Sequence, residues 1–134
     1  MSARFLADTS AVIRVLTGKA DQIWIYAVTA GTVAICDPVE LELLRDTPAD
    51  TRRPQIQRMI RLLYSWCPVP EDCWDQALRL QDDLAITGQH SGASAVDLRV
   101  AVTAMKNRLV VLHDDRDYEV IARASGLRVQ RVVA

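Results

Sequence analysis

The chain has 134 residues, of which half are apolar, so it is long enough for one domain with a full hydrophobic core. Its 16 basic and 17 acidic residues nearly cancel, so the composition lacks the excess positive charge that is typical of a general nucleic-acid binder. Three cysteines without a C-x-x-C pair argue against a disulfide framework and favour a reduced, cytoplasmic protein. No apolar run approaches the roughly 18 residues of a membrane span, so we expect no membrane insertion.

Short apolar runs alternate with helix-length periodic stretches along the whole chain. The predicted strands are 4–7, 32–36, 109–113 and 127–133, and the predicted helices are 9–18, 21–30, 37–46, 52–66, 71–86, 94–108 and 117–125. No repeat, low-complexity tract or linker divides the sequence, so residues 1–134 are expected to form a single domain. The alternation predicts an α/β fold of three layers, with a mainly parallel central sheet flanked by helices.

Several acidic residues stand where they could simply cap helices. Asp8 ends the first predicted strand and can cap the helix that follows it. Asp37 precedes a proline and is the expected cap of the helix 37–46. Ser94 and Asp97 have the spacing of a capping box. Capping therefore explains each acid taken singly.

Acids nevertheless recur at one place, because three of the four predicted strands are followed directly by acidic residues. These residues are Asp8 after the first strand, Asp37 and Glu40 after the second, and Asp114, Asp115 and Asp117 after the third. The carboxyl ends of parallel strands meet at one edge of a sheet, so these side chains can converge there. Asp97, in the first turn of the helix 94–108, is a further candidate.

Converging carboxylates need a compensating charge. Two like charges about 4 Å apart repel by several kcal/mol in a partly desolvated cleft, so a cation must bind or the pKa of at least one carboxyl group must rise. Oxygen ligands without a Cys or His cluster favour Mg²⁺ or Mn²⁺ over Zn²⁺. Such an ion suits the hydrolysis of phosphodiester bonds.

Four motifs in this order then resemble the PIN-domain ribonucleases, in particular the VapC toxins of toxin–antitoxin pairs. The motifs are "LADTSAV", "PVELELLR", "SAVDLRVAVTA" and "LVVLHDDRDYEVIA". The resemblance runs essentially from end to end. It implies a PIN-like fold, an endoribonuclease that depends on Mg²⁺ or Mn²⁺, an RNA substrate, a VapB-type antitoxin as partner, and a homodimer.

The resemblance also implies roles for individual residues. The matching acids, expected to be catalytic and to bind the metal, are Asp8, Glu40, Asp97 and Asp115, with Asp117 as a frequent fifth ligand and Ser10 as a supporting hydroxyl. Glu40 is matched as the glutamate before leucine in the family's E-L motif. His113 and Asp114 are expected to be structural, and His90 to lie in a polar loop.

Two further features concern partners of the site. No lysine lies near the acid motifs, so a basic group that orients phosphate must be an arginine, and the nearest are Arg99, Arg108 and Arg116. The helix 52–66 carries an apolar stripe that either faces the core or forms part of an antitoxin groove. The stripe consists of Ile56, Met59, Ile60 and Leu63, together with Ile23, Trp24 and Ala27 from the earlier helix 21–30.

Two alternatives remain open from the residues alone. A receiver-type phosphoacceptor domain is also α/β and also has acids after strands, but it uses a lysine after a late strand and adjacent acids after the first. A PIN domain with an inactive site would be a binding module, which the presence of all four acid positions argues against. Metal titration and RNA cleavage would separate the three classes.

Overall fold

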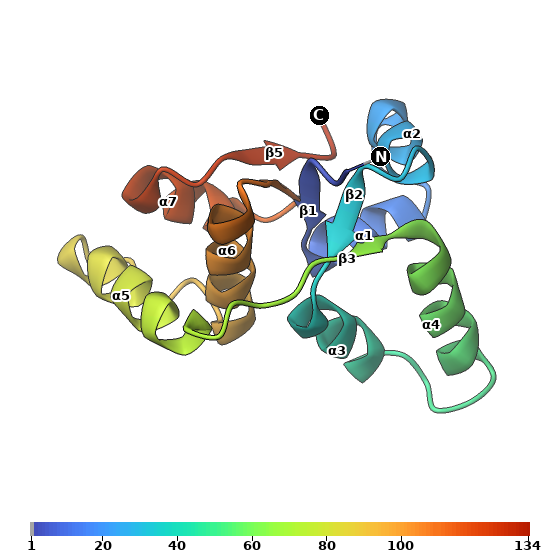
Figure 1. The fold of residues 1–134 in the computed structure, drawn as a ribbon, viewed down its shortest axis with the longest axis horizontal. Helices are drawn as coiled ribbons and strands as arrows, with labels where there is room; N and C mark the ends of the chain where they lie inside the picture. The colour runs from blue at the N-terminus through green and yellow to red at the C-terminus, as the bar shows by residue number, and fades with distance from the viewer. Residues whose placement is uncertain (1) are drawn as a thin grey trace.

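A five-stranded parallel sheet organises the structure, a computed structural model that describes residues 2–134 (Figure 1). The strands are β1 (Phe5–Ala7), β2 (Val33–Ile35), β3 (Ser65–Trp66), β4 (Val110–His113) and β5 (Val129–Arg131). Their order across the sheet is β3-β2-β1-β4-β5, and every neighbouring pair is parallel. The α/β class and the parallel central sheet predicted from the sequence are thus confirmed.

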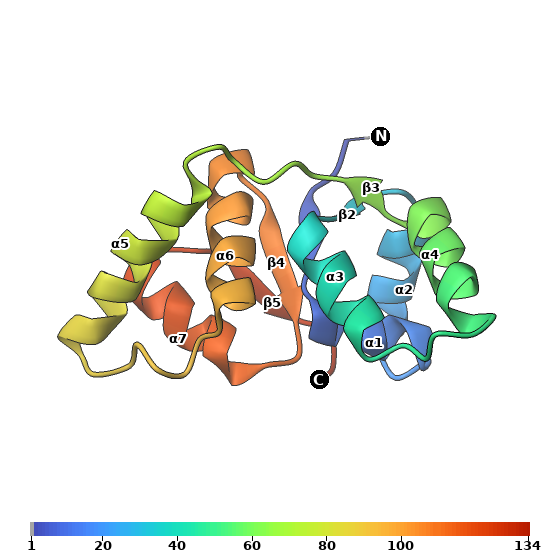
Figure 2. The same cartoon turned by 90° about the horizontal axis from the view of Figure 1, so that it is seen from below.

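Helices form the connections between the parallel strands. They are α1 (Thr9–Leu16), α2 (Gln22–Thr29), α3 (Asp37–Arg45), α4 (Arg52–Leu63), α5 (Cys73–Ile86), α6 (Ala95–Asn107) and α7 (Arg116–Ser125). Figures 1 and 2 show α1 to α4 gathered at one side of the molecule and α5 to α7 at the other. Within residues 2–134, no helix is both long enough and apolar enough to cross a membrane.

The core lies where the central strands meet helix α6. Leu6 of β1, Val33 of β2 and Val111 of β4 are completely buried, as expected of strands covered on both faces. Val100 and Ala101 of α6 are equally buried. This packing fixes the start of α6 relative to the ends of β1 and β4.

The strand order reverses direction at β1, so the carboxyl ends of β1 and β4 form the topological switch point of the sheet. The chain leaves β1 toward β2 on one side, whereas β4 pairs with the other side of β1. Ligand sites of open parallel sheets form at such a switch point. A receiver-type domain has the order 2-1-3-4-5 instead, so the observed topology argues against that alternative.

Two local predictions were wrong. The predicted helix 52–66 ends at Leu63, because Tyr64 turns to an extended conformation and Ser65–Trp66 pairs with β2 as an edge strand. A strand of two residues is too short to show a period in the sequence. The cap of α3 is Cys36, so Asp37 lies in the first turn rather than at the cap.

Candidate functional site

Three carboxylates from the start of α6 and the start of α7 lie close together. Asp97, Asp115 and Asp117 each offer one oxygen, and these atoms all lie within 4.8 Å of one another. No second group of three acidic, histidine or cysteine side chains meets this closely in residues 2–134. The structure thus brings together three of the acids predicted from the sequence, and oxygen-only ligands suit a hard divalent cation.

The first turn of α6 positions Asp97 through the predicted capping box. The Ser94 hydroxyl accepts a hydrogen bond from the backbone N–H of Asp97 at 3.1 Å. In return, Oδ2 of Asp97 accepts from the backbone N–H of Ser94 at 3.0 Å. The capping interaction therefore orients the Asp97 carboxylate, and a capping role is compatible with a metal-binding role.

The start of α7 positions the other two acids of the triad. Asp115 is the cap of α7, and its Oδ1 accepts from the backbone N–H of Asp117 at 2.9 Å. The backbone N–H of Asp115 donates to Nδ1 of the buried His113 at 3.1 Å. His113 thus supports the turn, in the structural role expected for it. A Cβ atom at Gly92 would lie only 3.1 Å from Oδ1 of Asp117, so the loop before α6 packs closely against this carboxylate.

Asp8 lies at the end of β1 as predicted, but it is not one of the three carboxylates within 4.8 Å. Its Oδ1 accepts from the backbone N–H of Ala11 at 2.9 Å, and the Ser10 hydroxyl donates to both carboxylate oxygens. The same hydroxyl accepts from the backbone N–H of Asp114 at 2.8 Å. Ser10 therefore ties the end of β1 to the end of β4.

Burial raises the pKa of several of these acids. The pKa of Asp8 rises to about 7, chiefly because the side chain is only 4% exposed, and the charge of Asp97 adds to this rise. Burial also raises the pKa of Asp97, with contributions from Asp115 and Glu42. Burial and then Asp115 raise the pKa of Asp117. The rise expected from crowding is present, although desolvation is its larger cause.

Tyr118 is buried near Asp8 and Asp97. Its side chain is completely buried, and its hydroxyl has no hydrogen-bond partner within residues 2–134. Burial raises the pKa of the phenol, and the charges of Asp8 and Asp97 add to this effect. The ring also packs 5.4 Å from the His113 ring, between centroids. The buried ring of Tyr118 therefore lies close enough to Asp8 and Asp97 to be affected by their charges.

The structure does not bring Glu40 into this group. Its Oε1 lies 3.3 Å from Nη2 of Arg61 on α4, and Figures 1 and 2 place α4 and α6 on opposite sides of α3. Glu42, two residues further along α3, points to the other side, and its charge raises the pKa of Asp97. Residues two apart on a helix differ by about 200° in direction, so only one of the two glutamates can face α6.

The sequence alone does not distinguish Glu42 from Glu40, because both glutamates flank the same buried stripe of Val39 and Leu43. Which glutamate faces the acids depends on whether α4 or α6 packs against its side of α3. The local sequence pattern does not contain this tertiary contact. The "ELEL" motif offers both candidates with the same local pattern.

Asp114 forms a separate ionic group. It lies 2.7 Å from Nε of Arg14 and 3.1 Å from Nη1 of Arg131, so its charge is balanced away from the triad. These pairs join α1, β5 and the loop after β4, which is consistent with the structural role expected for Asp114.

The three candidate phosphate-orienting arginines have different positions. Arg99 stacks 4.4 Å above the ring of Trp74 on α5. Arg108 lies just past the far end of α6, in a left-handed conformation. Arg116 directly precedes Asp117, and its charge opposes the rise in the pKa of that carboxyl. Of the three, Arg116 is the one beside the acids.

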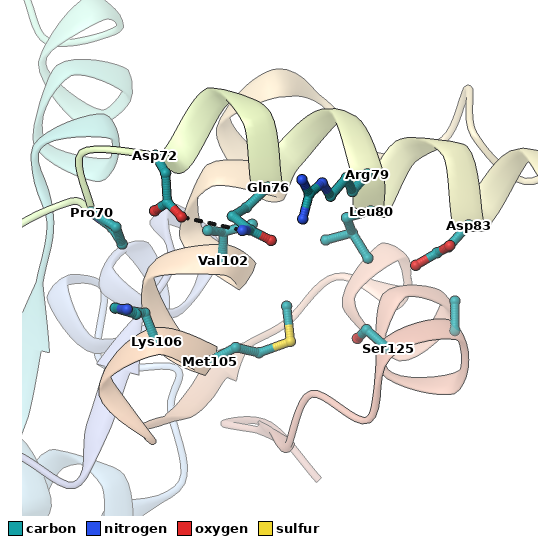
Figure 3. A pocket seen from close by; sticks show the side chains of 11 residues that line it. Pro70, Asp72, Gln76, Arg79, Leu80, Asp83, Val102, Met105, Lys106 and Ser125 are labelled. Carbon is teal, nitrogen blue, oxygen red and sulfur yellow. Dashed lines mark hydrogen bonds between the residues drawn. The ribbon is translucent and has the colours of Figure 1, made fainter.

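A separate hollow lies between α5, α6 and α7, and Figure 3 shows its lining. It has a volume of about 480 Å³ and carries both signs of charge, with Asp72, Arg79, Asp83 and Lys106 in its wall. Nε2 of Gln76 donates to Asp72 within it. None of the acids of the triad lines this hollow, so it is not part of the site.

No protein-family model matches the sequence. Individual relatives do, and they are ribonucleases of Mycobacterium tuberculosis. Ribonuclease VapC6 is 38% identical over 103 residues, which cover 76% of this chain and 81% of that protein. Ribonuclease VapC17 is 34% identical over 119 residues, covering 88% and 86%. Ribonuclease VapC2 is 32% identical over 136 residues, covering 96% and 92%.

Solved structures with the same fold point in the same direction. A DNA-bound VapBC from Salmonella typhimurium matches with a TM-score of 0.78 and 19% identity, over 96% of this chain and 98% of that one. VapBC2 from Rickettsia felis, bound to a promoter DNA fragment, matches with 0.75 and 15%, over 98% of each chain. At these identities the likeness supports the fold, whereas the Mycobacterium relatives establish descent. The chain belongs to the VapC family of PIN-domain ribonucleases.

Proposed function

We propose that the chain is a metal-dependent endoribonuclease that acts as the toxin of a toxin–antitoxin pair. The observation that carries this proposal is the meeting of Asp97, Asp115 and Asp117 within 4.8 Å at the switch point of the sheet. The relatives of this chain are named as ribonucleases, and the three carboxylates are chemically suited to that activity.

Asp97, Asp115 and Asp117 are the proposed metal ligands, with Asp8 beside them. The oxygen-only ligand set and the raised pKa values of Asp97 and Asp117 favour a divalent cation that would relieve the repulsion, and Mg²⁺ or Mn²⁺ fits best. When bound, such an ion polarises a phosphoryl oxygen and lowers the pKa of water. Glu42 takes the role that the sequence assigned to Glu40, because its charge acts on Asp97.

The remaining groups orient these acids and handle protons. The capping bonds from Ser94 and at the start of α7 hold Asp97 and Asp115 in fixed directions. The buried ring of Tyr118 adds apolar surroundings near Asp8 and Asp97. With a pKa of about 7, the Asp8 carboxylate can hold or release a proton near neutral pH.

An antitoxin of the VapB type is the proposed partner, because the structural neighbours are VapBC complexes. Most of the apolar stripe considered in the sequence faces the core: Ile60 is buried, and Ile56, Leu63, Trp24 and Ala27 pack against it. The exposed apolar side chains of these helices are Leu62 of α4 and Ile23 and Tyr26 of α2. Met59 and Leu62 line a shallow hollow of α4. These residues form the proposed docking surface.

The expected homodimer and cytoplasmic location belong to the same proposal. Trp74, Leu78 and Ile86 leave apolar surface exposed on α5, which a second copy could cover. All three cysteines are free and buried, which suits a reducing compartment. Sedimentation of the purified chain measures its oligomeric state. A monomer at micromolar concentration would contradict the proposed homodimer.

Growth of cells that express the chain tests the proposed function. The wild type should stop growth, whereas the isosteric variant Asp97→Asn should not, because it removes one charge from the proposed metal site. Co-expression of the gene product encoded beside this gene should restore growth. Leu62→Asp changes a side chain that is 79% exposed, so it should fold, remain toxic and resist rescue. Toxicity that survives Asp97→Asn would contradict the proposal.

A further inference from the structure

A second pocket shares a wall with the acid triad. It lies between the loop before α6 and helix α7, and its volume is about 490 Å³. The lining residues that matter here are Gln89, Ser91 and Gly92 from the loop and Arg116, Asp117 and Arg123 from α7. Asp117 therefore belongs both to the triad and to this pocket, which we call the α7 pocket.

The α7 pocket offers positive charge that the fold does not use. Arg116 and Arg123 form no ion pair with any part of residues 2–134. Glu119, which also lines the pocket, is already paired with Arg131. The two arginines are seven residues apart, so they lie on one face of α7 about 10 Å apart along its axis. The opposite wall adds the Gln89 amide and the Ser91 hydroxyl as further donors.

These features suit a phosphate and ribose segment of a nucleic-acid strand. Guanidinium groups bind phosphate through paired N–H donors, and amide and hydroxyl groups suit the remaining oxygens. The acidic side chains of the triad repel the phosphates of an RNA strand. Beyond the cleaved bond the strand therefore needs hydrogen-bond donors and positively charged side chains. The α7 pocket provides them in direct continuity with Asp117.

We propose that the α7 pocket holds the RNA backbone next to the cleaved phosphodiester, with Arg116 and Arg123 contacting its phosphates. This inference rests on the proposed ribonuclease function and names the positioning residues of its substrate. Arg116 is the nearer of the two to the acids, since it adjoins Asp117 in sequence. Arg123, two turns further along α7, contacts the strand farther from the cleaved bond.

Binding of a labelled single-stranded RNA, measured by fluorescence anisotropy in chelator so that no cleavage occurs, tests the proposal. Arg116→Ala and Arg123→Ala should each weaken the affinity about three- to tenfold. Each should also lower the slope of log affinity against log salt by about 0.7, as expected for one lost phosphate contact to a single strand. Arg116→Lys keeps the charge but loses the paired donors, so its affinity should fall between those of the wild type and Arg116→Ala.

Arg58→Ala is the matched control. Arg58 is an exposed arginine of α4, and Figures 1 and 2 place α4 and α7 at opposite ends of the molecule. The control should bind RNA as the wild type does. Inorganic phosphate at millimolar concentration should compete only weakly, because a strand offers several phosphates at once.

Two results would overturn the inference, and they are distinguishable. If the wild type binds and cuts RNA while the Arg116 and Arg123 variants bind it equally well, the α7 pocket is not part of the RNA path and the ribonuclease function stands. If the wild type neither binds RNA in chelator nor cuts it with Mn²⁺, the proposed function fails and the inference fails with it.

Discussion

The Ser10 hydroxyl lies 2.8 Å from Oδ1 and 2.9 Å from Oδ2 of Asp8, so one donor contacts both oxygens of a buried carboxylate. Hydrogen bonds to the charged form of an acid favour ionisation. The contact therefore lowers the pKa of Asp8 against the larger upward effect of burial.

Replacing Ser10 should raise the proton affinity of Asp8. The bound proton should then weaken metal binding at the neighbouring acids. We expect Ser10→Ala to raise the pKa of Asp8 above about 7 and to weaken Mn²⁺ binding at pH 6.5 more than at pH 8.5. Isothermal titration at both pH values measures this difference. Thr9→Val is the control, because the Thr9 hydroxyl is buried without a hydrogen-bond partner in residues 2–134. An equal loss at both pH values would argue against proton competition.

The two glutamates of α3 should behave differently. Glu42→Gln removes a charge that acts on Asp97, so it should weaken Mn²⁺ binding and RNA cleavage about tenfold or more. Glu40→Gln removes only the ion pair with the exposed Arg61 and should leave both nearly unchanged. Parallel titrations and cleavage assays of the two variants decide the assignment. A larger loss in Glu40→Gln would return the role to Glu40.

Metal-free stability should depend on pH through Asp8. Because the pKa of Asp8 is about 7 in the folded chain and 3.8 in the reference state, the folded chain holds this proton more tightly. The stability from Asp8 is present below pH 4 and is lost as the pH rises toward 7, with a slope of up to roughly 1.4 kcal/mol per pH unit. Above pH 7 the dependence should end.

Urea unfolding of the wild type and of Asp8→Asn, compared between pH 5 and 8 in chelator, isolates this effect. Burial lowers the pKa of His113, and that group contributes the opposite dependence in both proteins, so the difference between them reports Asp8. The free energy of unfolding of the wild type should fall relative to the variant across this range, and saturating Mn²⁺ should reverse the fall. A constant difference would show that Asp8 titrates normally.

Gly92 should be sensitive to a single methyl group. The added Cβ of Gly92→Ala would meet Oδ1 of Asp117 at 3.1 Å, so the carboxylate must shift. We expect weaker Mn²⁺ binding with a free energy of unfolding lowered by less than about 1 kcal/mol. In an Asp117→Asn background the same change should add little further loss of binding. Independent, additive losses would mean that Gly92 acts elsewhere.

The site residues that could be predicted from the sequence are those that a local sequence pattern already places at the start of a helix or the end of a strand. Asp97 stands in a capping box that forms as expected, and Asp115 and Asp117 follow a buried strand whose end had to lie at the sheet edge. The choice between Glu40 and Glu42 could not be made, because it depends on which helix packs beside α3. The edge strand β3 was missed because two residues carry no periodic signal.

Cleavage of a defined RNA by the purified chain at stepped Mn²⁺ concentrations tests the central claim most directly. Cleavage should rise with Mn²⁺, vanish in chelator and in Asp97→Asn, and leave 5′-phosphate and 3′-hydroxyl ends. Cleavage that persists in chelator, or products that carry a cyclic phosphate, would contradict a metal-dependent hydrolysis at Asp97, Asp115 and Asp117.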